Sequence, residues 1–163
     1  MGLQFRGKAQ LRPGGPTIAL TRPDLHTVKC IVADGNCLFR CFAYAITGSE
    51  DQHMAVRAAI VDHMVTIAHF LLGHGFIHSH SSVQEYIRAN NMDKVSAWGT
   101  EVEMFTLAHL LQTPVASWGD NHANWDILAP CDVDRTLNED STQMSIYLSL
   151  RSNHFEVVRS LRA

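Results

Sequence analysis

The sequence predicts an α+β domain, because the spacing of its apolar residues changes along the chain. In the first two thirds, apolar residues recur every three or four positions, as on one face of a helix. In the last third, apolar and polar residues alternate, as in strands. With 163 residues, of which 46% are hydrophobic, the chain can form one domain with one core. We expect a small central β-sheet packed between helices.

The domain does not begin at the first residue. Residues 1–24 are rich in Gly, Pro and Arg, and their Pro-Gly-Gly-Pro run prevents regular structure locally. We interpret residues 1–24 as an arm or lead-in and residues 25–163 as the folded domain.

Two helices are expected directly after the first extended segment. One begins at Cys37 and ends at Gly48, which suits a left-handed cap. The next begins at Ser49, which forms a capping-box pair with Gln52, and runs to about Leu72.

Two shorter helices and several strands complete the prediction. Each helix opens with a capping-box pair: Ser82 with Glu85, and Thr100 with Glu103. Strands or extended pieces are expected at residues 27–33, 114–118, 125–130, 143–150 and 154–161.

Composition excludes several classes of protein. The net charge is −3 and no block of like charges stands out, so we expect no nucleic-acid partner. The longest apolar runs are too short to span a bilayer, and the N-terminus lacks the apolar region of a secretory signal. We therefore expect a cytoplasmic protein, acting as a monomer.

The four cysteines are Cys30, Cys37, Cys41 and Cys131. A chain of this length does not need disulfides to hold its core, so we interpret them as free thiols in a reducing compartment. Three histidines, His74, His78 and His80, share one loop with no Cys-x-x-Cys nearby. We expect no metal and no cofactor.

The stretch "DGNCLFR" places Cys37 where a tight turn joins an apolar helix. Unpaired N–H groups and the helix dipole at such an end favour the thiolate, which is the nucleophilic form. The same N–H groups can stabilise an oxyanion. On this stretch alone, a buried structural thiol is the commoner outcome.

A thiolate nucleophile needs a base, and "SNHFEVV" supplies a candidate in His154. Glu156 lies two residues further, so on a strand both side chains point to the same face. A carboxylate beside an imidazole fixes its tautomer and stabilises the imidazolium. The alternative is a surface histidine on an edge strand.

Three blocks together resemble a known family. "DGNCLFRCFAYAITGSEDQHMAVRAAIVDHM", "WGTEVEMFTLAHLLQTPVASW" and "NHFEVV" resemble, in order and spacing, the signature of the OTU (ovarian tumour) cysteine proteases. The details are closest to OTU domains of viral polyproteins and animal mobile elements. The resemblance implies a papain-like OTU fold with the nucleophile at the N-terminus of a central helix.

The resemblance also implies an activity, namely hydrolysis of isopeptide bonds after the C-terminal glycine of ubiquitin or a ubiquitin-like modifier. Cys37 matches the nucleophile and His154 the general base. Asp34 matches an aspartate in the loop that shapes the oxyanion hole, where Gly35 and Asn36 would contribute backbone.

The orienting acid and one aromatic residue complete this site. Glu156 matches the acid, although the family more often has Asp or Asn there, so Asn153 or Asp34 could assist. Trp98 matches a Trp-Gly element expected near the active-site cleft. Two alternatives stay open: an OTU-like module that binds ubiquitin without cutting it, and a protease that processes its own polyprotein.

Overall fold

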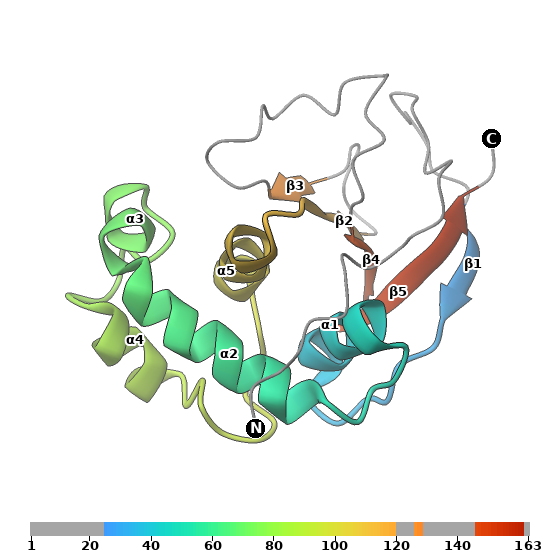
Figure 1. Cartoon of the computed structure of the whole chain (residues 1–163), viewed down its shortest axis with the longest axis horizontal. Helices are drawn as coiled ribbons and strands as arrows, with labels where there is room; N and C mark the ends of the chain where they lie inside the picture. Colours follow the sequence, from blue (N-terminus) through green and yellow to red (C-terminus); the bar gives the residue numbers. More distant parts are fainter. Residues whose placement is uncertain (1–24, 120–125, 129–145, 162–163) are drawn as a thin grey trace.

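A computed structural model describes residues 25–119, 126–128 and 146–161 (Figure 1). The arm expected at residues 1–24 and the thiol of Cys131 lie outside the described residues.

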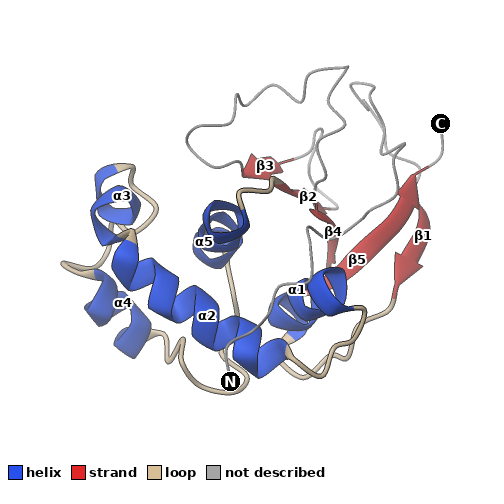
Figure 2. Cartoon of the chain, viewed as in Figure 1, coloured by secondary structure: helices blue, strands red, loops and turns tan. Residues whose placement is uncertain are grey.

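Helices occupy one side of the described domain and strands the other (Figure 2). The helices are α1 (Cys37–Thr47), α2 (His53–Thr66), α3 (Ala68–Gly73), α4 (Val83–Ala89) and α5 (Glu101–Leu111). The strands are β1 (Leu25–Lys29), β2 (Val115–Gly119), β3 (Asp126–Leu128), β4 (Ile146–Arg151) and β5 (His154–Leu161).

The strands form one mixed sheet in the order β1-β5-β4-β2-β3. β2 and β4 pair in parallel, and the other neighbours are antiparallel. Ser152 and Asn153 join β4 to β5 and both have positive φ, as a tight hairpin turn requires. The described helices lie between β1 and β2 in the chain and accompany one mixed sheet, which confirms the α+β prediction.

Helix α1 is the element around which the core forms. Its buried face includes Leu38, Phe39 and Phe42, all at most 1% exposed. Gly48 ends the helix at φ 82°, with its N–H donated to the Tyr44 carbonyl, so the predicted left-handed cap is confirmed. α1 packs against β5, which joins the start of the helical region to the end of the chain.

The predicted start of the second helix is wrong. α2 begins after Gln52, and the Ser49 hydroxyl accepts from Asp51 N instead of capping the helix. The Ser49 hydroxyl also donates to the Asp51 carboxylate at 2.9 Å. A local contact with Asp51 therefore replaces the predicted capping pair.

The predicted end of that helix is also wrong, because α2 stops at Thr66 and α3 is separate. Ile67 lies between them at φ −101° and ψ 22°. Val65, Thr66 and Ile67 are three consecutive β-branched residues, which weaken a helix. The break keeps Ile67 and Leu71 buried in the core.

The two later capping predictions fare differently. Thr100 and Glu103 form the complete capping box, with Thr100 N 2.6 Å from the Glu103 carboxylate. Ser82 caps α4 by accepting from Glu85 N, but the Glu85 carboxylate accepts from Ser81 N. The box at α4 is therefore half formed.

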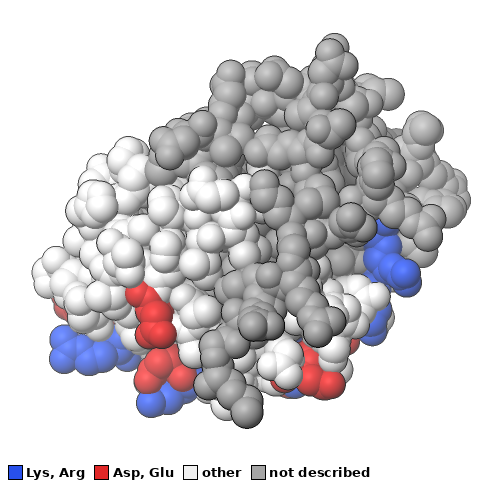
Figure 3. Space-filling model, in the orientation of Figure 1, with Lys and Arg blue, Asp and Glu red and all other residues white. Residues whose placement is uncertain are grey.

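The surface carries both signs of charge. On the face in Figure 3, basic and acidic groups of the described residues alternate along the lower edge. In the described segments, no helix is both long and apolar enough to cross a bilayer. Nor do three or more side chains that could ligate a metal gather among these residues. His74 instead stacks on Phe70, with 3.7 Å between ring centroids.

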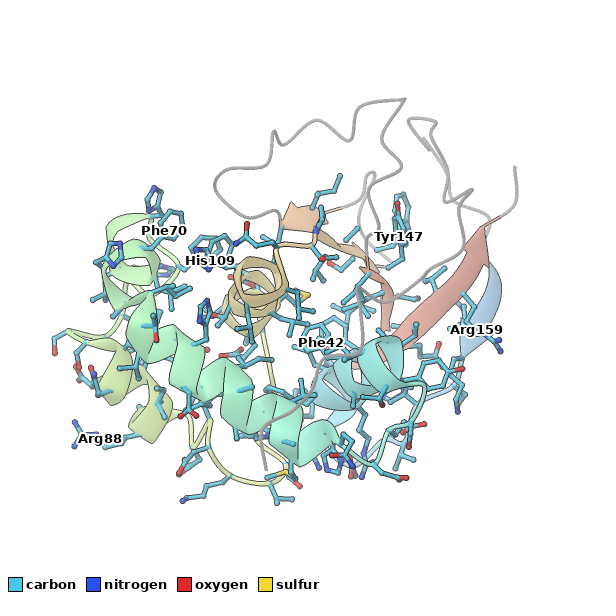
Figure 4. All side chains as sticks on the ribbon, viewed as in Figure 1. Phe42, Phe70, Arg88, His109, Tyr147 and Arg159 are labelled. Carbon is cyan, nitrogen blue, oxygen red and sulfur yellow. The ribbon has the colours of Figure 1, made fainter. Side chains whose placement is uncertain are left out.

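A histidine pair joins α2 to α5. His63 Nε2 lies 2.9 Å from His109 Nδ1, and His109 lies near Phe70 at the end of this interface (Figure 4). Burial and the neighbouring His109 lower the pKa of His63 below its ordinary 6.5. Between the ordinary pKa of the unfolded chain and the lowered pKa of the folded protein, His63 binds a proton only in the unfolded chain. The stability of the fold therefore decreases as the pH drops through this range.

We expect the Tm to fall as the pH drops below the ordinary histidine pKa of 6.5, and His63→Gln to flatten this dependence. Glutamine can keep a hydrogen bond to His109 but does not titrate. His69→Gln, at an exposed histidine of α3, is the matched control. An unchanged pH profile of thermal unfolding in His63→Gln would contradict the assignment.

Candidate active site

The turn before α1 consists of residues 34–36, and the side chain of its first residue, Asp34, holds it in place. Asp34 Oδ1 accepts from Asn36 N at 3.0 Å, which closes an Asx turn. Gly35 lies inside this turn at φ 81°, and a Cβ there would be 2.9 Å from the Ser96 carbonyl oxygen. Both the backbone conformation and the close approach of Ser96 therefore require glycine.

Asn36 precedes α1 as its N-cap residue but does not cap it. Its side chain makes no capping hydrogen bond and is 1% exposed. Its Oδ1 atom accepts from Ser96 N at 2.8 Å and from Arg57 Nη2 at 2.9 Å. The first N–H groups of α1 are thus left without the acceptor that a capping side chain supplies. Cys37, half-buried, is the first residue of this uncapped end.

Arg40, one turn into α1, pairs with the carboxylate of Asp34. Arg40 Nη2 lies 2.6 Å from Asp34 Oδ2, and Arg40 Nε lies 3.1 Å from each carboxylate oxygen. This guanidinium holds the pKa of the Asp34 carboxyl well below its usual range. Asp34 is therefore a charged acceptor throughout the neutral pH range.

Arg57 of α2 holds the other side of the turn. Its side chain is buried and donates to Asn36 Oδ1, to the Ala97 carbonyl at 2.8 Å and to the Met92 carbonyl at 3.0 Å. Its guanidinium lies over the Phe39 ring, 3.7 Å from the centroid. One cation therefore joins the turn, α1 and the loop after α4.

Trp98 lies on that same loop, beside the turn. Ser96 contacts Gly35, and a Cβ at Gly99 would be 2.5 Å from the Leu38 side chain, so the loop packs on α1 on both sides of Trp98. The Trp98 residue itself is 63% exposed. The structure thus places this ring at the surface next to the Cys37 turn.

His154 and Glu156 lie on β5, the strand that packs against α1. They are two residues apart and share a face of the strand. Within the described part of the chain, no hydrogen bond joins the His154 ring to the Cys37 thiol or to Glu156. Such bonds are often long in a free enzyme and shorten when substrate binds.

The other described thiols differ from Cys37 in environment. Cys41 is fully buried, and burial raises its pKa well above the usual value, with smaller contributions from Cys37, Glu50 and Glu156. Cys30 is exposed and precedes the turn.

The sequence-based interpretation gave no role in the site to three residues of this arrangement: Arg40, Arg57 and Ser96. An arginine amid the apolar α2 sequence "AVRAAIV" was the available signal for a buried guanidinium. The structure also differs in the use of Asn36, whose N–H is occupied by Asp34 and is not free for an oxyanion.

Comparison with known proteins identifies relatives over most of the chain. A protein family described as OTU-like cysteine protease matches residues 32–155. No curated protein sequence matches the chain significantly.

Several solved structures share its fold at low sequence identity. The OTU domain protease of Qalyub virus is 20% identical with a TM-score of 0.61, covering 80% of this chain and 82% of that one. The OTUD1 OTU domain is 22% identical with a TM-score of 0.61, covering 80% and 83%. The Hazara virus OTU, solved bound to ubiquitin, is 19% identical with a TM-score of 0.60, covering 84% and 82%. These similarities confirm the expected fold.

Proposed function

The chain belongs to the family of OTU-like cysteine proteases, and on this premise we propose that it is a thiol protease of the deubiquitinase type. Its reaction is hydrolysis of the isopeptide bond after the C-terminal glycine of ubiquitin or a ubiquitin-like modifier. The observation that carries the proposal is Cys37 at the uncapped N-terminus of α1, in a turn held from two sides.

In the proposed mechanism, Cys37 Sγ attacks the scissile carbonyl and His154 takes the thiol proton. The carbonyl oxygen becomes an oxyanion, stabilised by backbone N–H groups of the turn and the start of α1. Because the Asn36 N–H is occupied, Gly35 and Cys37 supply the donors. His154 then protonates the leaving amine, and water hydrolyses the thioester to release the modifier and restore the thiol.

Ubiquitin is the proposed partner because OTU structures of this fold have been solved with it. The Hazara virus OTU is bound to ubiquitin, and an Ovarian Tumor domain in complex with ubiquitin has a TM-score of 0.53 to this chain. We propose that residues 25–163 form the catalytic domain and act as a monomer. We propose a cytoplasmic location, because the cytosol keeps thiols such as Cys37 reduced.

A ubiquitin probe with a C-terminal electrophile tests the proposal. We expect one adduct per chain, located on Cys37 by peptide mass spectrometry. Labelling without cleavage of ubiquitin chains would instead favour processing of a polyprotein, which a flanking-region peptide substrate can detect. Ubiquitin binding with neither labelling nor cleavage would identify a non-catalytic binding module.

His154→Ala is expected to reduce turnover by about a thousandfold, since a positioned base contributes roughly 10²–10⁴-fold. Steady-state cleavage of a ubiquitin-dye substrate measures this loss. Exposed His69 provides the control His69→Ala, which should keep full activity. Equal activity in the two variants would remove His154 from the mechanism.

Glu156→Ala is expected to reduce turnover less than His154→Ala, because the nucleophile and base remain. Glu156→Gln should reduce it less again, since glutamine can accept from the imidazole but loses the charge that stabilises the imidazolium. Single-turnover rates of the two variants measure this difference. Unchanged rates in both would assign the orienting role to another residue.

A further inference from the structure

We infer that Arg40 is a positioning residue for hydrolysis: its guanidinium holds Asp34 in the orientation that aims the backbone around Cys37 at the oxyanion. The inference rests on the proposed function, because it concerns the same site. Arg40 touches neither the thiol nor the base in our mechanism and acts only through Asp34.

Arg40 holds the turn at two points. Its side chain binds both carboxylate oxygens of Asp34, with distances of 2.6 and 3.1 Å. Its backbone N–H donates to the Asn36 carbonyl at 2.9 Å. The side chain thus links Asp34, the first residue of the Asx turn, to the first turn of the helix. Two-point binding by a planar guanidinium restricts the carboxylate more than a single contact can.

The restricted carboxylate in turn orients the peptide groups of the turn. Asp34 Oδ1 accepts from Asn36 N at 3.0 Å, and Asn36 leads directly into Cys37. A different Asp34 rotamer would free the Asn36 N–H and allow the turn to rotate. The donors proposed for the oxyanion would then move, and misplacement by about 1 Å can cost on the order of a hundredfold in rate.

The same pair contributes little to holding the fold. The Arg40 and Asp34 side chains are 16% and 33% exposed, and partly exposed ion pairs typically stabilise a fold only weakly. The buried contacts of Asn36 with Arg57 and Ser96 do not involve Arg40. Loss of the Arg40 side chain should therefore change catalysis more than folding.

Three variants test the inference: Arg40→Ala, Arg40→Lys and the control Arg88→Ala, at an arginine of α4 that points away from the domain (Figure 4). We expect Arg40→Ala to lower kcat on a ubiquitin-dye substrate by about tenfold to a hundredfold, with KM and Tm nearly unchanged. Arg40→Lys should restore part of the rate, because lysine keeps the charge but not the two-point geometry. Arg88→Ala should match the wild type.

Alkylation by iodoacetamide separates positioning from thiol activation, because that reaction displaces iodide and forms no oxyanion. We expect the alkylation rate of Cys37 to be the same in wild type and Arg40→Ala. A parallel loss of alkylation and hydrolysis would overturn the inference by showing that Arg40 acts on the thiol. Full rescue by Arg40→Lys would also overturn it, since charge alone would then suffice.

A double variant tests whether Arg40 acts through Asp34. Asp34→Ala combined with Arg40→Ala should be no slower than Asp34→Ala alone, and independent, multiplying losses would overturn the inference. Amide hydrogen exchange at Asn36 provides a readout that needs no substrate. Exchange should speed up in Arg40→Ala, and unchanged exchange would overturn the inference. A wild type inactive on ubiquitin but with this exchange response would refute only the proposed function.

Discussion

Cys37→Ala is expected to abolish measurable cleavage of ubiquitin conjugates, with a rate loss on the order of a millionfold. No other residue of the proposed mechanism can form the thioester, so the loss is complete and not partial. The fold should be retained, because Cys37 is only half-buried and alanine is a smaller side chain. Hydrolysis of a ubiquitin-dye substrate, together with a thermal melt, measures both expectations.

Cys30→Ala is the matched control, because this second thiol is exposed and lies just before the same turn. It should retain full turnover. Cys41 is fully buried with a raised pKa, so it should resist alkylation in the folded protein. Probe labelling that survives Cys37→Ala and disappears in Cys30→Ala would overturn the assignment of the nucleophile.

Local sequence signals predicted those helix boundaries that depend on local contacts. The left-handed cap at Gly48 and the box of Thr100 with Glu103 involve only neighbouring residues, and both are confirmed. The box at Ser49 failed because the Ser49 hydroxyl pairs with Asp51, accepting from its N–H and donating to its carboxylate, and Gln52 precedes the helix instead. The capping-box rule compares only the first and fourth residues of the motif, so it does not consider this competing partner.

In the candidate site, contacts between adjacent residues were predicted, and contacts between residues far apart in the sequence were not. The tight turn before Cys37 was predicted, because the residues that form it are adjacent, and the structure shows the Asp34 carboxylate accepting from a backbone N–H within it. The second support of this turn was not predicted. It depends on Ser96 approaching Asn36 from 60 residues away. Only the folded chain brings that loop beside the turn, so the family motif could indicate the nucleophile but not what holds it.

Arg57→Ala is expected to cause the largest loss of stability, about 3–5 kcal/mol. The substitution removes a fully buried side chain and leaves a cavity against Phe39. It also removes the donors to Asn36 Oδ1 and to the carbonyls of Met92 and Ala97. Because a domain is typically stable by only about 5–15 kcal/mol, the variant should unfold at markedly lower denaturant concentration. Equilibrium urea unfolding measures the difference.

Arg57→Met separates the packing of this side chain from its hydrogen bonds. Methionine fills much of the same volume but donates nothing, so it should lose roughly half as much stability as Arg57→Ala. The opposing effect is desolvation, which lowers the pKa of Arg57, and its Nε atom has no hydrogen-bond partner among the described residues. Burial of a charge can destabilise the fold by as much free energy as the contacts of that charge stabilise it. We expect this cost to be smaller than the stabilisation from the three hydrogen bonds to oxygen acceptors and the contact with the Phe39 ring. A methionine variant as stable as the wild type would contradict this expectation. In that case Arg57 would serve to position Asn36 and the Cys37 turn and not to stabilise the fold, and turnover would fall while the unfolding midpoint stayed constant.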